Sequence, residues 1–319
     1  GHPQWGYYAR RVRAIGQDGD FTTTAEIAPA LARAVAFWLK QALAETACQQ
    51  VIELGPGSGR LAEAVMRHMP WWQRRGLVWH LVECSSELRA QQQRRQWPCR
   101  VHWHADVAAA LRACDGAACV YSNEFFDALP IRIFRHRDDA WQELWLKWQE
   151  PMALGQGGWS ETWRDVAERP DSTLWAHPQA QQARIEVAVG LHQWLLAMLP
   201  LWQRGAMLML DYGAEVTAQT RLAPLGSVRA YWRQQRWQGA AVYQNPGHQD
   251  LTYDVNFTDV PHWARPWVRD ATLQTQRDFL LPHIRRGHEG DAAAVATEGA
   301  GSAFAVSYTH LTLPTKRIV

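Results

Sequence analysis

The sequence has no long apolar run and no strong excess of one charge. No stretch of its 319 residues approaches the roughly 20 consecutive apolar positions of a membrane span, so we expect no membrane insertion. The 33 Lys and Arg residues nearly balance the 31 Asp and Glu residues, which leaves a formal net charge of +2. This balance excludes a global field that would hold the protein on nucleic acid or an anionic membrane, although local patches stay open.

Cysteine is also scarce and shows no pattern. The five cysteines are an odd number and include no C-x-x-C pair, so neither a disulfide framework nor a thiolate zinc site is indicated. Free thiols favour a reducing compartment, and we expect a cytoplasmic protein of bacterial type. His102 and His104 share one face of a predicted strand, but no third ligand is identifiable, so we expect no metal site.

Both ends of the sequence look unusual. The chain starts at Gly1 without a methionine, in what reads as the middle of a domain, so we expect a preceding segment to be missing. Residues 306–319 resemble the translation of a sequencing adapter, and we predict that they are a non-native tail outside the fold. The alternative is a genuine disordered or strand-like tail.

The first half of the chain alternates helices and strands. Thr23 and Glu26 match a capping box followed by apolar residues at helical spacing, which predicts a helix to about residue 47 and a helical cap segment over 1–47. Strands are predicted at 50–54, 77–83, 100–104 and 117–122, with helices at 58–69 and 85–96 between them. This alternation predicts a doubly wound α/β fold with a mostly parallel, Rossmann-like sheet.

The pattern changes from residue 131. Two neighbouring strands are predicted at 131–136 and 141–148, and several glycines break the sequence that follows. We therefore predict an inserted subdomain or lid over about 137–185, within a main domain that spans 48–305. A helix is expected from about Gln179 to Trp202, after which the sheet resumes with a strand at 206–213.

The stretch VIELGPGSGR, at 51–60, joins a predicted strand to a helix through three glycines. Such a turn lets a ligand approach the backbone closely and lie near the amides that begin the helix. The dinucleotide fingerprint fits poorly, because Arg60 stands where its third glycine belongs. The stretch instead resembles motif I of class I S-adenosylmethionine (SAM) methyltransferases, and this resemblance implies a SAM-binding turn. The motif residues here are Glu53, Gly55, Gly57 and Gly59. A tight turn without a ligand is the structural alternative.

Three acids are candidates for further contacts with the cofactor. Glu83 ends the second predicted strand, where a carboxylate can accept hydrogen bonds from both ribose hydroxyls of a nucleoside. Asp106 stands where methyltransferases of this class often carry an acid near the adenine amino group, but a helix N-cap explains it equally well. Asp20 is a candidate to cover the cofactor from the N-terminal segment, with a plain turn as the equal alternative.

The segment SNEFFDALPIRIF, at 122–134, follows the fourth predicted strand. Ligands of parallel α/β sheets bind outside the carboxyl ends of the strands, so the polar residues of this segment are expected to face a reacting centre. The segment closely resembles the MidA-type methyltransferases, a family that includes a mitochondrial complex I assembly factor that methylates a protein arginine. Weaker matches to the same family follow in order over residues 6–281.

The resemblance implies a SAM-dependent methyltransferase that acts on a protein, with an arginine side chain as the acceptor and a respiratory-complex subunit as a candidate substrate. A guanidinium is protonated at neutral pH, so carboxylates must hold and polarise it. We therefore predict that Glu124 and Asp127 are catalytic, while Asn123 positions the acceptor or closes the methionine end of the cofactor. Asp211 and Asp250 are weaker candidates for binding the acceptor, because acids at such positions are more often caps or turn residues.

Two other functions stay open on the sequence alone. One is a non-catalytic SAM-binding assembly factor, because a fold does not establish a function. The other is a nucleotide-dependent oxidoreductase, which Arg60 disfavours. Basic runs at 94–100 and 232–237 suggest nucleic acid, but the near-zero net charge and the lack of an RNA-binding motif favour solvated helix faces instead. We therefore expect no nucleic-acid partner.

Overall fold

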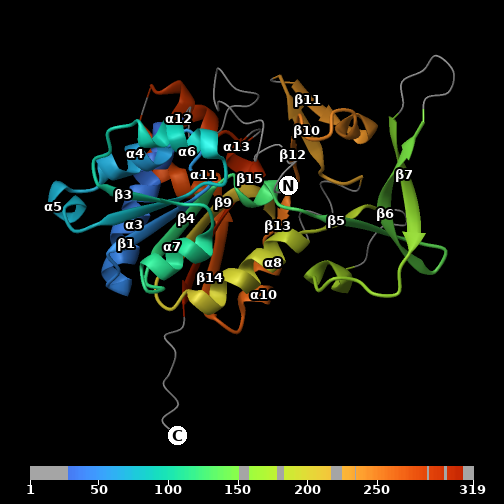
Figure 1. Ribbon diagram of the computed structural model, residues 1–319, viewed down its shortest axis with the longest axis horizontal. Helices are drawn as coiled ribbons and strands as arrows, with labels where there is room; N and C mark the ends of the chain where they lie inside the picture. Colours follow the sequence, from blue (N-terminus) through green and yellow to red (C-terminus); the bar gives the residue numbers. More distant parts are fainter. Residues whose placement is uncertain are drawn as a thin grey trace, which may run out of the picture.

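The central sheet has the strand order of a doubly wound domain. A computed structural model of the chain describes residues 28–150, 158–177, 183–216, 225–233, 235–285, 287–297 and 300–311. Its largest sheet contains β1 (Gln50–Leu54), β2 (Val78–Val82), β3 (Arg100–His104), β4 (Cys119–Asn123), β9 (Ala206–Ala214), β13 (Val255–Asn256), β14 (Val268–Thr275) and β15 (Phe304–Leu311). The order is β14-β15-β9-β4-β1-β2-β3, with β13 beside the end of β9 (Figure 1). The pairs from β9 to β3 are parallel, so the predicted α/β fold with a mostly parallel sheet is confirmed.

Helices cover both faces of this sheet. One face carries α3 (Pro29–Thr46) and α4 (Arg60–His68), with α11 (Gln276–Leu280) and α12 (Glu289–Ala294) beside α3. The other face carries α7 (Val107–Ala113), α8 (Val189–Met198) and α10 (Asp259–Ala264). The remaining helices of the described residues are α5 (Trp71–Arg74), α6 (Ser86–Gln93), α13 (Ala300–Ala303), η1 (Phe126–Ala128), η2 (Thr173–Ala176), η3 (Leu199–Leu201), η4 (Gly239–Tyr243) and η5 (Leu281–His283).

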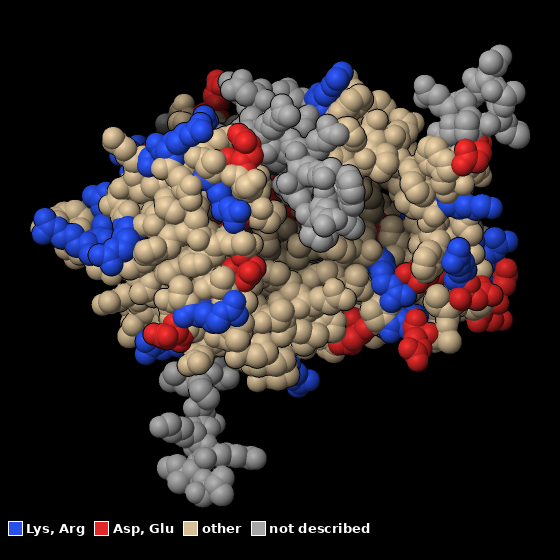
Figure 2. Space-filling model, viewed as in Figure 1, with Lys and Arg blue, Asp and Glu red and all other residues tan. Residues whose placement is uncertain are grey.

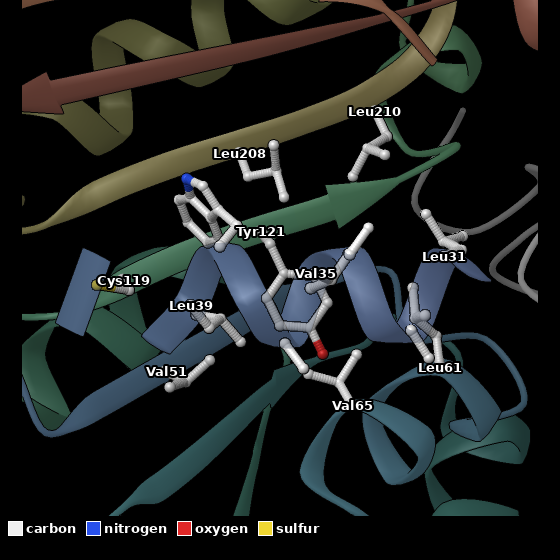
Figure 3. Close-up of a cluster of buried hydrophobic side chains, with 14 of the residues drawn as sticks. Leu31, Val35, Leu39, Val51, Leu61, Val65, Cys119, Tyr121, Leu208 and Leu210 are labelled. Carbon is white, nitrogen blue, oxygen red and sulfur yellow. The ribbon is translucent and has the colours of Figure 1, made fainter. Parts of the chain in front are cut away.

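The core beneath α3 is closely packed. Leu31, Val35 and Leu39 follow one another along α3 at helical spacing and lie against Val51 of β1 and Tyr121 of β4 (Figure 3). All five side chains are fully buried, and each large apolar side chain buried in this way contributes about 1.5–3 kcal/mol. The apolar face of α3 thus holds the helix across the middle of the sheet.

The start of α3 differs from the predicted helix. Residue Ala28 is extended, and the helix begins at Pro29, whose fixed φ and missing N–H suit the first turn. The capping box around Thr23 lies outside the described residues. The predicted end near residue 47 agrees with the last helical residue, Thr46.

A separate antiparallel sheet follows β4. It consists of β5 (Arg132–Arg137), β6 (Ala140–Gln149), β7 (Gly158–Asp165) and β8 (Ile185–Val187), in the order β7-β6-β5-β8. Asp138 and Asp139 both have positive φ angles, 50° and 58°, which suit a two-residue hairpin turn between β5 and β6. The predicted insertion covered 137–185, whereas this sheet extends from Arg132 to Val187 and projects from the main domain (Figure 1).

The helix expected from Gln179 to Trp202 is wrong in its first half. Within that range the described chain first forms β8, which pairs with β5, and α8 begins only at Val189. A short apolar run with β-branched residues at 185 and 187 suits a buried strand as well as a helix, and pairing with β5 decides the outcome. A third small sheet, β10 (Arg229–Trp232), β11 (Gln235–Gln238) and β12 (Asp250–Thr252), was not predicted.

The predicted tail boundary at residue 306 also differs from the structure. Strand β15 runs antiparallel between β9 and β14, with Val306 opposite Leu210 on one side and Gln274 on the other. Ser307 and Thr309 are buried along with Val306, because both faces of the strand are covered. Residues 306–311 therefore lie inside the sheet, whereas 312–319 lie outside the described residues. The non-native origin of the segment stays a prediction.

Candidate active site

The glycine turn joins β1 to α4. Gly55, Gly57 and Gly59 have φ angles of +62°, +55° and +77°, in the left-handed region that residues with a Cβ rarely adopt. Gly59 is the N-cap of α4, so the amides at the start of the helix open towards the turn. The backbone N–H of Gly55 donates to the carbonyl of Val82, which ties the turn to the end of β2. Local backbone geometry therefore requires the three glycines.

Side chains from two directions fix this turn. A Cβ on Gly55 would lie 2.8 Å from Cδ2 of Phe125, which belongs to the segment that follows β4. On the other side, the buried Gln92 of α6 donates from Nε2 to the carbonyl of Gly57 at 2.8 Å. Its Oε1 accepts from Trp103 Nε1 at 3.0 Å, so the amide of Gln92 is held in place. The structure thus brings the glycine turn into contact with the second motif that the sequence singled out.

Glu83 points toward the glycine turn. It stands one residue beyond β2, with 6 % of its surface exposed, and its Oε1 accepts from the backbone N–H of Ser85 at 2.9 Å. Burial raises the pKa of Glu83, while hydrogen bonds from the backbone of Ser85 and of Gly57 oppose the shift. The carboxylate therefore lies between the end of β2 and the turn, where the predicted ribose contact would be made. That contact stays a prediction.

Glu53 lies in the core rather than on the open side of the turn. It is 2 % exposed and shares a hydrogen bond with the buried Tyr121, whose hydroxyl also accepts from Trp79 Nε1. Burial raises the pKa of Glu53 to about 8. Its Oε2 has no hydrogen-bond partner among the described residues. Its first role is therefore to support the strand from which the turn starts, and direct cofactor binding by Glu53 stays a prediction.

The structure gives Asp106 its capping role. It is the N-cap of α7, and its Oδ1 accepts from the backbone N–H of Ala109 at 2.8 Å. The adenine contact proposed for this residue is an additional prediction that the cap neither requires nor excludes. Asp20 lies outside the described residues.

The turn after β4 carries Asn123, Glu124 and Asp127. Asn123 is the last residue of β4, and its Nδ2 donates to Glu124 Oε1 at 3.3 Å. Glu124 has a φ of +52°, a left-handed conformation that is costly for a residue with a side chain and often marks a functional position. The backbone N–H of Glu124 donates to the carbonyl of Leu210, so strand β9 holds the strained residue in place.

Asp211 of β9 fixes the shape of this turn. It is fully buried, and its Oδ2 accepts from the backbone N–H groups of Phe125 at 3.1 Å and Phe126 at 2.8 Å. Its Oδ1 accepts from the backbone N–H of Tyr212 at 3.0 Å. Burial raises the pKa of Asp211 to about 7, and the backbone donors oppose the shift. The structure thus shows a positioning role for Asp211, whereas acceptor binding by this residue stays a prediction.

Asp127 lies at the centre of a group of four carboxylates. It is 3 % exposed, and burial raises its pKa well above the usual range of an aspartate. The charges of Asp211, Asp250 and Glu124 raise the pKa further. Asp250, on β12, is also 3 % exposed, so a strand of the third sheet brings this acid to the end of β4 and β9. The structure thus collects four acids from three separate segments.

One buried cation faces these acids. Arg229 of β10 is 4 % exposed, and its Nη1 donates to Asp254 Oδ1 at 2.6 Å and to the carbonyl of Ser227 at 3.2 Å. Its guanidinium lies 4.7 Å from the ring centroid of Tyr212, and its charge lowers the pKa of Asp127. Its Nη2 has no hydrogen-bond partner among the described residues. Sequence reasoning gave Arg229 no role, because its significance depends on the unpredicted third sheet.

Aromatic side chains close the back of the turn. The ring of Trp194 on α8 packs edge to face against Phe126, with 5.0 Å between ring centroids, and against Phe125 at 6.0 Å. Tyr253 donates from its hydroxyl to the carbonyl of Phe126 at 2.9 Å, and its backbone N–H donates to the carbonyl of Asp127. The turn is therefore rigid, and its acids lie in a surrounding of low polarity that strengthens their interaction with a cation.

The arrangement suits SAM and a cationic acceptor together. The glycine turn and Glu83 would hold the cofactor, and Phe125 links that turn directly to the acidic group after β4. Within the described residues, no three His, Cys, Asp or Glu side chains form a group that could hold a metal ion. None of the helices in the described part of the chain combines the length and apolar character needed to cross a bilayer.

Comparisons with known proteins identify the family. A family described as "Putative S-adenosyl-L-methionine-dependent methyltransferase" matches residues 30–271. The NDUFAF7 homologue of Drosophila melanogaster, named a mitochondrial protein arginine methyltransferase, is 29% identical over 82% of this chain and 64% of its own length. The protein of that name from Danio rerio is 27% identical over 88% of this chain and 69% of its own length. The chain thus spans about two thirds of these curated relatives.

A solved structure shows the same fold over nearly the whole chain. It is a protein from Burkholderia thailandensis bound to S-adenosyl-homocysteine, with a TM-score of 0.79, 23% sequence identity, and coverage of 97% of this chain and 84% of that one. The predicted family and the predicted cofactor are confirmed, and the oxidoreductase alternative is set aside. The chain belongs to this family of S-adenosyl-L-methionine-dependent methyltransferases.

Proposed function

We propose that the protein transfers a methyl group from SAM to an arginine side chain of another protein. The observation that carries this proposal is a group of four carboxylates, the half-buried Glu124 and the buried Asp127, Asp211 and Asp250, next to Phe125, which packs against the glycine turn. A site with more acids than cations suits a ligand that brings positive charge. The relatives named as protein arginine methyltransferases support the same acceptor.

The carboxylates of the turn would hold and orient the guanidinium. Glu124 and Asp127 can accept its N–H groups in a paired geometry, and Asp211 keeps both acids in place by fixing the turn. SAM supplies the sulfonium methyl when it is bound. As the new N–C bond forms and the S–C bond breaks, the attacking nitrogen must lose a proton, which an ionised carboxylate of the turn would accept.

The test compares methyl transfer with cofactor binding in matched variants. We expect Asp127→Asn and Glu124→Gln to lower methyl transfer by a factor of about 100 or more, because the acceptor loses its charge partner in a dry site. Affinity for SAM should stay within a few-fold of the unmodified protein. Asp165→Asn, an exposed acid on β7, is the control and should change neither quantity.

Two outcomes would contradict the proposal. Full methyl transfer by the Asp127 and Glu124 variants would remove these residues from catalysis. Tight SAM binding without transfer to any protein would favour the non-catalytic assembly factor instead.

The acceptor can be identified directly. A cell lysate is incubated with isotope-labelled SAM and this protein, and the modified residues are mapped by mass spectrometry. The MidA-type resemblance makes a respiratory-complex subunit the first acceptor to test.

A further inference from the structure

The short helix α5 exposes two neighbouring tryptophans. Trp71 and Trp72 are 58% and 63% exposed, more than any other tryptophan among the described residues. Their rings contact each other edge to face, with an interplanar angle of 87°. Single exposed apolar side chains are ordinary, but a pair of indoles at the tip of a domain forms a patch that water solvates poorly.

An open groove with three arginines lies beside this pair. The groove has a volume of about 550 Å³, and its lining includes Trp71, Arg74, Arg75, Pro98 and Arg100 but no acidic residue. The guanidinium of Arg75 lies 4.9 Å from the ring centroid of Trp71. Neither Arg74 nor Arg100 forms an ion pair with any carboxylate of the described chain. The groove therefore presents positive charge that no carboxylate of the described residues neutralises in an ion pair.

On the face that Figure 2 draws, the charge around α5 is of one sign. Figure 2 shows Lys and Arg, without Asp or Glu, at the left end of the molecule, where Figure 1 places α5. The net charge of the whole chain is only +2, so this is a local feature rather than a general basicity. The four-stranded β5–β8 sheet lies at the opposite end.

We propose that α5 and its arginine groove bind the phosphate headgroups of anionic phospholipids and attach the protein to a membrane surface by this end. Planar guanidinium groups pair with phosphate oxygens, and exposed indoles favour the boundary between headgroups and acyl chains. The attachment is peripheral and needs no spanning segment. It is independent of methyl transfer, because the groove lies beside the amino ends of β2 and β3, whereas Glu83 and the acidic turn lie at the carboxyl ends of the parallel strands.

A single-stranded nucleic acid is the other phosphate-bearing partner, and the rings argue against it. Stacking of successive bases requires exposed ring faces arranged along a groove. The two indoles instead meet at nearly a right angle, and only the face of Trp71 is approached by an arginine of the groove. The geometry therefore fits a soft surface better than a stack of bases.

The test is co-sedimentation of the full chain with vesicles. We expect binding to vesicles that contain phosphatidylglycerol and little binding to pure phosphatidylcholine. Each arginine near an anionic surface contributes about a fivefold gain in affinity, so Arg74→Gln with Arg100→Gln should weaken binding about 25-fold. Trp71→Ala with Trp72→Ala should weaken it similarly. Trp145→Ala with Trp148→Ala, which removes exposed tryptophans from β6, is the matched control and should bind like the unmodified protein.

Clear results would overturn this proposal. One is that the unmodified protein does not bind vesicles, and another is that all variants bind them equally well. A third is that the groove binds inorganic phosphate or a single-stranded RNA while the protein does not bind vesicles. SAM affinity and methyl transfer in solution should be unchanged in the groove variants. That readout verifies folding, and it separates a failure of this proposal from a failure of the proposed methyl transfer.

Discussion

The carboxylate of Asp211 accepts a hydrogen bond of 2.8 Å from the backbone N–H of Phe126, which lies 85 positions earlier in the chain. The inserted sheet occupies much of the sequence between them, yet β9 lies directly beside β4. The turn that carries Glu124 and Asp127 is therefore held by a residue from a strand far along the sequence. This contact makes the acidic turn a property of the assembled sheet rather than of its own local sequence.

Replacing Asp211 should damage both stability and activity. In Asp211→Ala the backbone N–H groups of Phe125 and Phe126 lose their acceptor, and each buried unpaired donor costs about 1–3 kcal/mol. We expect a fall of about 3 kcal/mol in the free energy of unfolding, measured by urea denaturation. Asp211→Asn keeps one acceptor oxygen, so its free energy of unfolding should lie between those of Asp211→Ala and the unmodified protein. Equal stability of Asp211→Ala and the unmodified protein would show that the turn holds its own shape.

Gly55→Ala should impair cofactor binding. The new Cβ would lie 2.8 Å from Cδ2 of Phe125, and the alanine would have to adopt a φ of +62°, which residues with a Cβ rarely do. We expect SAM affinity, measured by calorimetry, to fall about tenfold or more, with destabilisation of about 1–2 kcal/mol. Gly239→Ala is the matched control, because its φ is +60° and no atom lies within 4 Å of the new Cβ. It should cost similar backbone strain but leave SAM affinity unchanged.

The buried carboxyl of Glu53 should make stability depend on pH. The folded protein keeps this proton up to about pH 8, whereas the unfolded chain releases it near the ordinary pKa of 4.5. The native state therefore binds more protons in this window, so Glu53 lowers the free energy of unfolding as the pH rises from 4.5 to 8. Glu53→Gln stays neutral and removes this contribution. Relative to the unmodified protein, the free energy of unfolding of the variant should gain about 5 kcal/mol across the window. If the free energy of unfolding of the two proteins, measured by urea denaturation, changed in parallel with pH, a raised pKa at Glu53 would be excluded.

Arg229 should be needed for the geometry of the acidic group. Arg229→Met keeps much of the buried volume but leaves the acids without their internal cation. Removing one partner of a largely buried ion pair costs about 3 kcal/mol, so we expect marked destabilisation in urea. Combining it with Asp254→Asn should restore part of the loss, because the former partner is then neutral. If the two substitutions changed the free energy of unfolding additively, the ion pair between Arg229 and Asp254 would contribute nothing to stability.

Much of the sheet could be predicted from the sequence. Strands β1 to β4 lie within two residues of the strands predicted at 50–54, 77–83, 100–104 and 117–122, and α6 falls within the helix predicted at 85–96. The glycine turn and the segment after β4 could also be assigned to the same end of the sheet, because parallel neighbouring strands carry their carboxyl ends together. The contact between Gly55 and Phe125 follows from that topology.

The remaining parts of the site depend on contacts that no local pattern encodes. Asp250 and Arg229 reach the acidic turn from the third sheet, whose three short strands have too few residues to show a clear alternation. Strand β15 was missed for two reasons. Its sequence resembled an adapter, and because its side chains are buried on both faces, it lacks the usual alternation of apolar and polar residues. Asp106 illustrates a different limit, because its local sequence suited two roles equally well, a helix cap and a ligand contact. The structure shows the cap.

The left-handed backbone of Glu124 makes glycine the mildest replacement at this position. Glycine adopts a φ of +52° without steric cost, whereas alanine keeps the strain, so the glycine variant should be more stable by about 1 kcal/mol. Both variants lack the carboxylate. Comparing them separates what the acid contributes to methyl transfer from what its unusual conformation costs the folded chain, a distinction that a single pair of substitutions rarely permits.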